Sequence, residues 1–168
     1  MTRHSTRIEP GGRLCRWATL AADAPDLAET GRALLQQFGG VGLAFLATVR
    51  RDGAPRLHPV CPVLTPERLH VLITPESPKR GDLERDGRYA LQTFPQSKAG
   101  SDEFYAAGRA MLVADPAERH AVFQSARHMW DPSEIVFELW LERVQHTRWE
   151  HPLTPEMRPV RRGWRPPA

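Results

Sequence analysis

Short apolar segments, each followed by a turn, recur along the chain and restrict it to a fold built largely from β-strands. Residues 43–49 (LAFLATV) precede Asp52-Gly53, a dipeptide that favours a tight hairpin. Pro- and Gly-containing turns separate the later segments, and Gly108 inside one of them is typical of a β-bulge. The predicted strands are 43–49, 56–64, 68–74, 88–94, 103–114 and 135–148.

Two prolines interrupt the second predicted strand. Pro59 and Pro62 have no N–H group to donate to a neighbouring strand. We therefore expect residues 56–64 to be bulged or to lie at the edge of a sheet.

Three helix starts accompany these strands. Asp23, Pro25 and Asp26 begin a helix that ends at Gly39-Gly40, and Ser77-Pro78 begins a short helix over about 78–86. Asp115-Pro116 begins another, which stops at Asp131-Pro132. Six mostly antiparallel strands with a few peripheral helices predict an α+β fold built on a β-barrel.

The positive charge of the chain is concentrated at its two ends. Its 168 residues include 23 Lys+Arg and 20 Asp+Glu, with a pI near 9.3. Residues 1–16 and 157–168 carry eight of the arginines, so 17–156 is mildly acidic. We expect an Arg-rich N-terminal tail over 1–22, one ligand-binding domain over 23–152 and a Pro/Arg-rich tail over 153–168. Nucleic acid is not an expected partner, because binding it requires a basic face.

Membrane, metal and hydrolytic classes lack their sequence signals. No stretch of 18 apolar residues and no apolar leader is visible. The seven histidines show no metal-ligand spacing, and no G-x-S-x-G, H-E-x-x-H or Gly-rich phosphate loop occurs. Cys15 and Cys61 lie 46 residues apart, as expected of free thiols in a reducing cytoplasm. We therefore expect a cytoplasmic protein without a membrane partner or a bound metal.

The segment 70–83 (HVLITPESPKRGDL) is the first candidate for ligand binding. A strand ends at Thr74, Ser77 caps a helix, and the first turn of that helix carries Lys79 and Arg80. Free N–H groups at a helix start, hydroxyls and positive side chains together suit a phosphate group. An ordinary N-cap followed by a solvated turn would use the same residues, so both interpretations stay open on spacing alone.

The second candidate is His58-Pro59-Val60-Cys61. A strand broken by prolines leaves backbone N–H and C=O groups available to a flat heteroaromatic ligand with hydrogen-bonding edges. The alternative is an edge strand that its prolines protect from aggregation.

Taken in order, these motifs resemble the pyridoxamine 5′-phosphate oxidase-like family of flavin-binding split β-barrels. The resemblance covers roughly 41–149. It consists of a strand ending in a DG turn, then P-x-x-P-V, T-x-x-S-x-K-x-x-D-L, D-G-R-Y-A-L and G-R-A-x-L-V. It implies a six-stranded split β-barrel that forms a homodimer, with one FMN at each end of the interface.

The resemblance also assigns roles by position. The FMN phosphate would be held by Thr74, Ser77 and Lys79, with Arg80 as a neighbouring option. The isoalloxazine would be lined by His58, Pro59, Val60 and Cys61. The implied activity is that of an FMN-dependent oxidoreductase acting on an unidentified small molecule. Because the flavin carries the hydride or electron transfer, no catalytic side chain is assigned.

One departure from the family limits the implied substrate. The oxidases proper handle their substrate with a C-terminal Arg/His-containing segment, which MRPVRRGWRPPA does not reproduce. Vitamin B6 oxidation is therefore not implied. Two alternatives stay open: a reductase of the same fold that uses the deazaflavin coenzyme F-420, and a non-catalytic sensor that binds flavin or haem.

Overall fold

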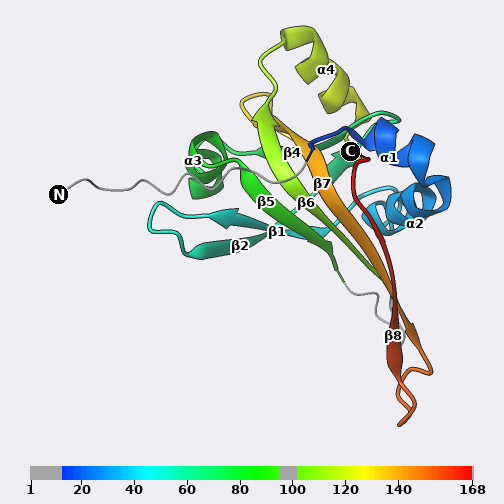
Figure 1. Ribbon diagram of the computed structural model, residues 1–168. Helices are drawn as coiled ribbons and strands as arrows, with labels where there is room; N and C mark the ends of the chain where they lie inside the picture. The colour runs from blue at the N-terminus through cyan, green and yellow to red at the C-terminus, as the bar shows by residue number, and fades with distance from the viewer. Residues whose placement is uncertain (1–12, 95–101, 168) are drawn as a thin grey trace.

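The structure, a computed structural model, describes residues 13–94 and 102–167. Over these residues the chain is α+β, with four helices and eight strands (Figure 1). The helices are α1 (Trp17–Asp23), α2 (Pro25–Leu35), α3 (Pro78–Arg85) and α4 (Pro116–Ser125). The strands are β1 (Ala44–Val49), β2 (Pro55–Val60), β3 (Pro62–Leu64), β4 (Leu69–Ile73), β5 (Arg88–Thr93), β6 (Glu103–Leu112), β7 (Ile135–Glu150) and β8 (Arg158–Trp164).

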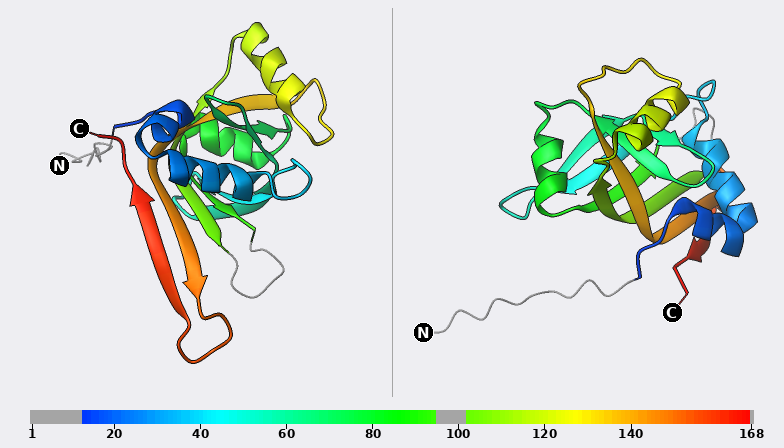
Figure 2. Two further views of the ribbon diagram at one scale, coloured as in Figure 1. Left: turned by 90° about the vertical axis from the view of Figure 1, so that its right-hand side faces the viewer. Right: turned by 90° about the horizontal axis from the view of Figure 1, so that it is seen from above.

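All strands belong to one antiparallel sheet, ordered β2-β1-β5-β6-β7-β4-β3, with β8 paired to β7. The sheet curls strongly (Figure 2, right), but its hydrogen-bonded path is open between β2 and β3. The expected count of six strands is therefore wrong, and the sheet does not close into a barrel. One cause is Pro62, which divides the predicted strand 56–64 into β2 and β3. Both pieces lie at edges of the sheet, as their prolines predicted.

Local turn signals in the sequence identified several features correctly. The Asp52-Gly53 turn joins β1 to β2, and Gly53 adopts a φ of 84°. The pairing of β6 with β7 shifts register between Ala107 and Gly108, which confirms the predicted bulge. The helix predicted from Pro25 and Asp26 begins at Pro25 as α2.

The N-terminal segment contains structure where we expected a tail. α1 lies within residues 1–22 except for its last residue, and the side chain of Trp17 is fully buried in the main core. Just before it, the Cys15 N–H donates to the Leu141 carbonyl (3.0 Å) and the Leu141 N–H donates to the Cys15 carbonyl (2.8 Å). Residues 1–12 lie outside the described part of the chain.

The C-terminal segment also departs from a tail. β8 pairs with the end of β7 in a regular register that runs from Val144–Trp164 to Glu150–Arg158. The two strands project from the body of the protein as a ribbon (Figure 1). Backbone hydrogen bonds between β7 and β8 hold this ribbon together. The arginine-rich composition of the segment gave no sign of such pairing, and the sequence therefore predicted a tail.

Helices α1 and α2 add their apolar side chains to the main core inside the curled sheet. At Gly31, α2 approaches the ring of Phe104 on β6 so closely that a Cβ atom would lie 2.4 Å from Phe104 Cε2. A smaller cluster beneath α4 contains Val63, Val122 and Phe123. Within the described residues, no helix is both long and apolar enough to cross a membrane.

We expect Gly31→Ala to lower the free energy of unfolding by about 1–3 kcal/mol, because the buried Phe104 ring cannot move away without repacking. Chemical denaturation measures this change. The control is Gly81→Ala in α3, where a Cβ meets nothing within 4 Å. That variant should be more stable by about 0.5–1 kcal/mol. Equal effects of the two substitutions would contradict the packing of α2 against Phe104.

Candidate cofactor-binding site

The junction between β4 and α3 brings the predicted phosphate-binding residues together. Ser77 is the N-cap of α3 and has extended backbone angles, as predicted from Ser77-Pro78. Its N–H donates to the Thr74 carbonyl and its carbonyl accepts from the Arg80 N–H, both at 3.0 Å. The Ser77 hydroxyl makes no capping hydrogen bond, and the first turn of α3 contains no acidic residue. This hydroxyl is therefore available to a ligand in front of the helix.

A buried carboxylate anchors α3 to the sheet. Asp82 is 4% exposed and accepts hydrogen bonds from Thr48 Oγ1 (2.9 Å), Arg56 Nε (2.7 Å) and Arg85 Nη2 (3.3 Å). Burial by itself raises the pKa of Asp82, but the hydrogen bonds from Arg56, Thr48 and Arg85 outweigh it, so the pKa is lowered overall. Asp82 is therefore ionised at neutral pH and fixes the position of the Arg56 guanidinium.

Arg56 is a site residue that the sequence interpretation missed. It lies on β2 directly across from Thr48 of β1, and its side chain reaches α3 through Asp82. The pKa of Lys79 is lowered, first by partial burial and then by the positive charge of Arg56. The positive charge of Arg56 therefore acts on Lys79. The period of two along β2, which puts Arg56 on the same face as His58, is the one sequence signal that could have found it.

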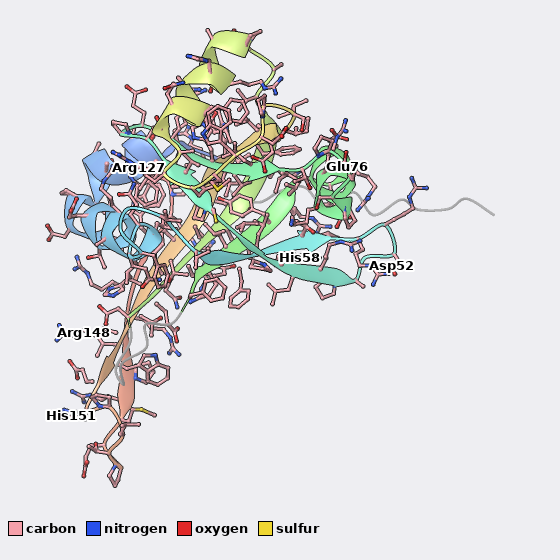
Figure 3. The ribbon with its side chains drawn as sticks, turned by 180° about the vertical axis from the view of Figure 1, so that it is seen from behind. Asp52, His58, Glu76, Arg127, Arg148 and His151 are labelled. Atoms are coloured by element: carbon pink, nitrogen blue, oxygen red, sulfur yellow. The ribbon has the colours of Figure 1, made fainter. Side chains whose placement is uncertain are left out.

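The predicted ring-binding residues follow Arg56 along the same strand. His58 and Val60 lie on the face of β2 that is more buried, whereas Pro59 faces the exposed side. Cys61, between β2 and β3, has a pKa raised by burial and by the nearby charge of Glu134. Figure 3 shows His58 partway along β2, with Glu76 beside α3 and Asp52 at the β1–β2 turn.

Arg80, the neighbouring option for the phosphate, has a partner elsewhere. Its Nε atom lies 2.9 Å from Glu84 Oε1, one turn further along α3. Both side chains are about two-fifths exposed (40% and 39%). The charge of Arg80 is partly neutralised by Glu84, whereas the charged group that acts on Lys79 is the cation Arg56.

A cleft adjoins the candidate site. It has a volume of about 430 Å³ and lies between the β1–β2 turn and α3. Four arginines line it, Arg50, Arg51, Arg56 and Arg85, against the acids Asp52 and Asp82. The cleft is therefore a second place where negative charge is favoured.

These groups suit a phosphate monoester better than they suit a metal. Hydroxyl donors and two neighbouring cations give the charge-assisted hydrogen bonds that a phosphate accepts. Within residues 13–94 and 102–167, no group of three His, Cys, Asp or Glu residues is placed to hold a metal ion.

The model of the pyridoxamine 5′-phosphate oxidase family matches residues 28–148, and the chain therefore belongs to this family. The match includes every residue of the candidate site. Among curated proteins, no sequence matches the chain.

Solved structures share the fold at low sequence identity. A haem-binding protein from Mycobacterium smegmatis is 16% identical, with a TM-score of 0.57 over 77% of this chain and 56% of its own. HupZ from group A Streptococcus is 18% identical, with a TM-score of 0.57 over 69% of this chain and 90% of its own. General stress protein 26 from Bacillus anthracis is 17% identical, with a TM-score of 0.54 over 70% and 91%. At these identities the likeness concerns the fold alone. The chain spans little more than half of the Mycobacterium protein.

We expect Asp82→Asn to lower the free energy of unfolding at neutral pH by about 1–3 kcal/mol, because Arg56 and Thr48 lose an ionised acceptor. The folded pKa of Asp82 lies below its ordinary value of 3.8. The stabilisation is therefore present above that pH and is lost as the pH falls through the folded pKa. Denaturation of the wild type and the variant at a series of pH values should show the difference closing in acid.

The control for this prediction is Asp23→Asn, the same substitution at an exposed residue at the end of α1. It should change stability by no more than about 0.5 kcal/mol. A difference between wild type and Asp82→Asn that stays constant from neutral to strongly acidic pH would contradict the role of the ionised carboxylate.

Proposed function

We propose that this protein is an FMN-binding oxidoreductase of the pyridoxamine 5′-phosphate oxidase-like type, which acts on a small molecule as a homodimer. The observation that carries the proposal is the uncommitted Ser77 hydroxyl at the start of α3, whose first turn has no acidic residue and carries Lys79. The positive charge of Arg56 acts on Lys79, and a phosphate dianion bound at the start of α3 would be attracted by both cations. Family membership supports the same ligand.

In this proposal Thr74, Ser77, Lys79 and Arg56 hold the phosphate. Lys79 supplies a mobile positive charge, while Arg56 is held in a fixed orientation by Asp82. The free Ser77 hydroxyl donates one further hydrogen bond. Arg80 is a weaker option, because Glu84 partly neutralises its charge.

The flavin ring lies along β2 in this proposal. His58, Pro59 and Val60 follow Arg56 on β2, and Cys61 comes directly after the strand, so a ligand whose phosphate is at Arg56 can extend its ring towards the end of β2. Bound flavin supplies the hydride or electron transfer. The side chains bind and orient it, and the small-molecule substrate is received at the exposed edge of β2.

The outer face of the sheet supports the homodimer. Along β1, β2 and β5 this face carries small and apolar residues that are half-buried or exposed: Phe45, Ala47, Val49, Leu57, Pro59 and Ala90. Leu57 is 63% exposed. A second copy packed there would remove this surface from water. Both cysteines are free, which suits a cytoplasmic protein.

Two other ligands are supported by particular observations. The arginine-lined cleft beside α3 would suit the acidic tail of a deazaflavin coenzyme. The shared fold with a haem-binding protein supports haem carriage without turnover. The visible spectrum of the purified protein separates the three, because flavin, deazaflavin and haem absorb differently. A colourless protein that takes up none of them would overturn the whole proposal.

We expect Lys79→Ala to weaken FMN binding by about 1–3 kcal/mol, roughly five- to 150-fold, because a charge-assisted hydrogen bond to phosphate is lost. Adding Ser77→Ala should weaken it further. Quenching of flavin fluorescence on titration measures the affinity. The control is Arg127→Ala, at an exposed arginine after α4 (Figure 3). It also removes one positive charge and should leave the affinity for FMN unchanged. Wild-type affinity for FMN in both Lys79→Ala and the double variant with Ser77→Ala would rule out this phosphate site.

For the dimer, Ala47→Glu is the decisive variant. Ala47 pairs with Leu57 on one side and Ala90 on the other, so it lies within the apolar outer face. A carboxylate buried there without a partner is costly, and we expect the variant to be a monomer. Light scattering during size-exclusion chromatography gives the mass. Ala33→Glu, at an exposed residue of α2, should keep the wild-type mass. A dimeric Ala47→Glu protein would place the interface elsewhere.

A further inference from the structure

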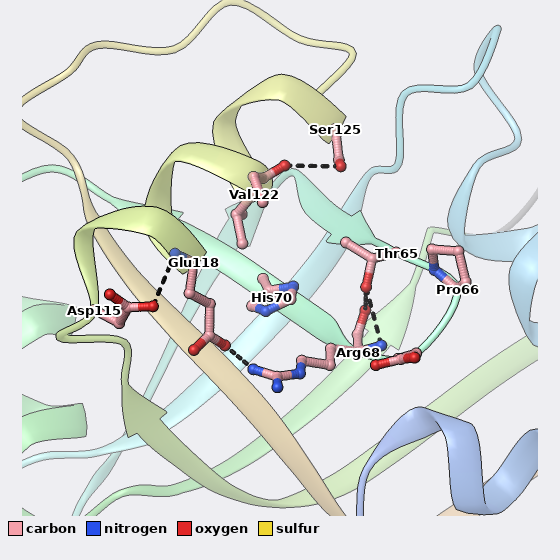
Figure 4. A pocket seen from close by; sticks show the side chains of 10 residues that line it. Thr65, Pro66, Arg68, His70, Asp115, Glu118, Val122 and Ser125 are labelled. Carbon is pink, nitrogen blue, oxygen red and sulfur yellow. Dashed lines mark hydrogen bonds and ion pairs between the residues drawn. The ribbon is translucent and has the colours of Figure 1, made fainter.

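A separate cavity lies away from the candidate cofactor site and from the cleft beside α3. It has a volume of about 520 Å³ and lies between α4 and the turn that joins β3 to β4 (Figure 4). Its polar lining includes Thr65, Arg68, His70, Glu118 and Ser125, and Val122 contributes an apolar wall.

His70 is the unusual residue of this cavity. It lies on β4 with 1% of its surface exposed, and its ring nitrogens have no hydrogen bond of good geometry, only a weaker contact with the Val63 backbone. Burial lowers its pKa to about 4, with a further lowering from Arg68 and a small opposite effect of the Val63 backbone. The imidazole is therefore neutral and keeps an unused acceptor nitrogen. Buried polar groups without partners are rare in proteins, so this one calls for an explanation.

The charges around His70 favour a cation. Among the lining residues, Glu67, Asp115 and Glu118 are acidic and Arg68 is the single base. The Arg68 guanidinium is hydrogen-bonded to Glu118 and lies 3.8 Å from Glu138 Oε2. It already occupies the position that a cationic ligand would take.

If Arg68 leaves that position, one of its two acidic neighbours still has a basic partner. Its side chain is 24% exposed, so the guanidinium can turn towards water. Glu138, which is 6% exposed, keeps its 3.0 Å contact with Arg16 Nε. Glu118 has no second basic partner among the described residues and would be left to the ligand.

We propose that this cavity binds a small organic cation with N–H donors, whose charge replaces the Arg68 guanidinium at Glu118 and whose N–H group reaches His70. The ligand class is a primary amine, guanidinium or amidinium with an apolar part that contacts Val122 and Ala121. The three carboxylates in the lining, against one guanidinium, disfavour an anion, and the acceptor nitrogen of His70 suits an N–H donor. The inference does not depend on flavin binding, because none of these residues belongs to the cofactor site.

Benzamidine and benzoate form a matched pair of probes, since they share a shape and carry opposite charges. We expect saturable binding of benzamidine to the full-length protein by isothermal titration calorimetry at neutral pH, and no binding of benzoate. Glu118→Gln should weaken benzamidine binding at least tenfold. The control is Glu29→Gln, the same change at an exposed residue of α2, which should have no effect. Equal binding of both probes, no binding of benzamidine, or equal behaviour of the two Gln variants would overturn the proposal.

Two further variants separate a binding role from a structural one. His70→Leu should keep or raise the melting temperature, because it removes a buried polar group without a partner, yet it should weaken benzamidine binding at least fivefold. Arg68→Gln should tighten binding severalfold, because it removes the competing guanidinium. A destabilised His70→Leu protein with wild-type affinity, or weaker binding by Arg68→Gln, would show that these residues serve the fold alone.

Discussion

The hydrogen bonds to the Asp82 carboxylate determine how the rest of the candidate site is arranged. Thr48 on β1, Arg56 on β2 and Arg85 on α3 all donate to it, so one buried charge joins three elements. Burying a carboxylate is costly unless it is paired and hydrogen-bonded, and here three donors meet that requirement. As a result α3 begins beside Arg56, and Lys79 lies near a second cation. The positive charge of Arg56 adds to the effect of burial in lowering the pKa of Lys79.

The two sheet edges follow from a different constraint. Pro59 and Pro62 cannot donate to a ladder, so the chain between β1 and β4 forms two edge strands instead of one internal strand. The sheet stays open between these two strands. At its other end β7 runs beyond β6 and pairs with β8, which forms the projecting ribbon (Figure 2, left). Backbone pairing thus places the arginine-rich C-terminal segment on an ordered element.

Asp82 and His70 illustrate two outcomes for a buried polar side chain. The Asp82 carboxylate has three donors, and its substitution should therefore cost stability. The His70 ring has none, although it is buried as deeply, and it lies beneath an Arg68–Glu118 ion pair that can open. This difference is the reason for proposing a binding site in the cavity between α4 and the β3–β4 turn.

The sequence by itself determined the features that depend on neighbouring residues. The Asp52-Gly53 turn, the Ser77 N-cap, the bulge at Gly108 and the edge position of the proline-containing strand were all predicted, because turn geometry, capping and a missing N–H act within a few residues. The tertiary structure decided the rest. Arg56 belongs to the candidate site because it contacts Asp82, which is 26 residues further along the chain. The eighth strand, the helix α1 in the expected tail and the buried His70 likewise depend on partners distant in the sequence. Local patterns cannot specify such partners, because their pairing is settled only when the chain packs.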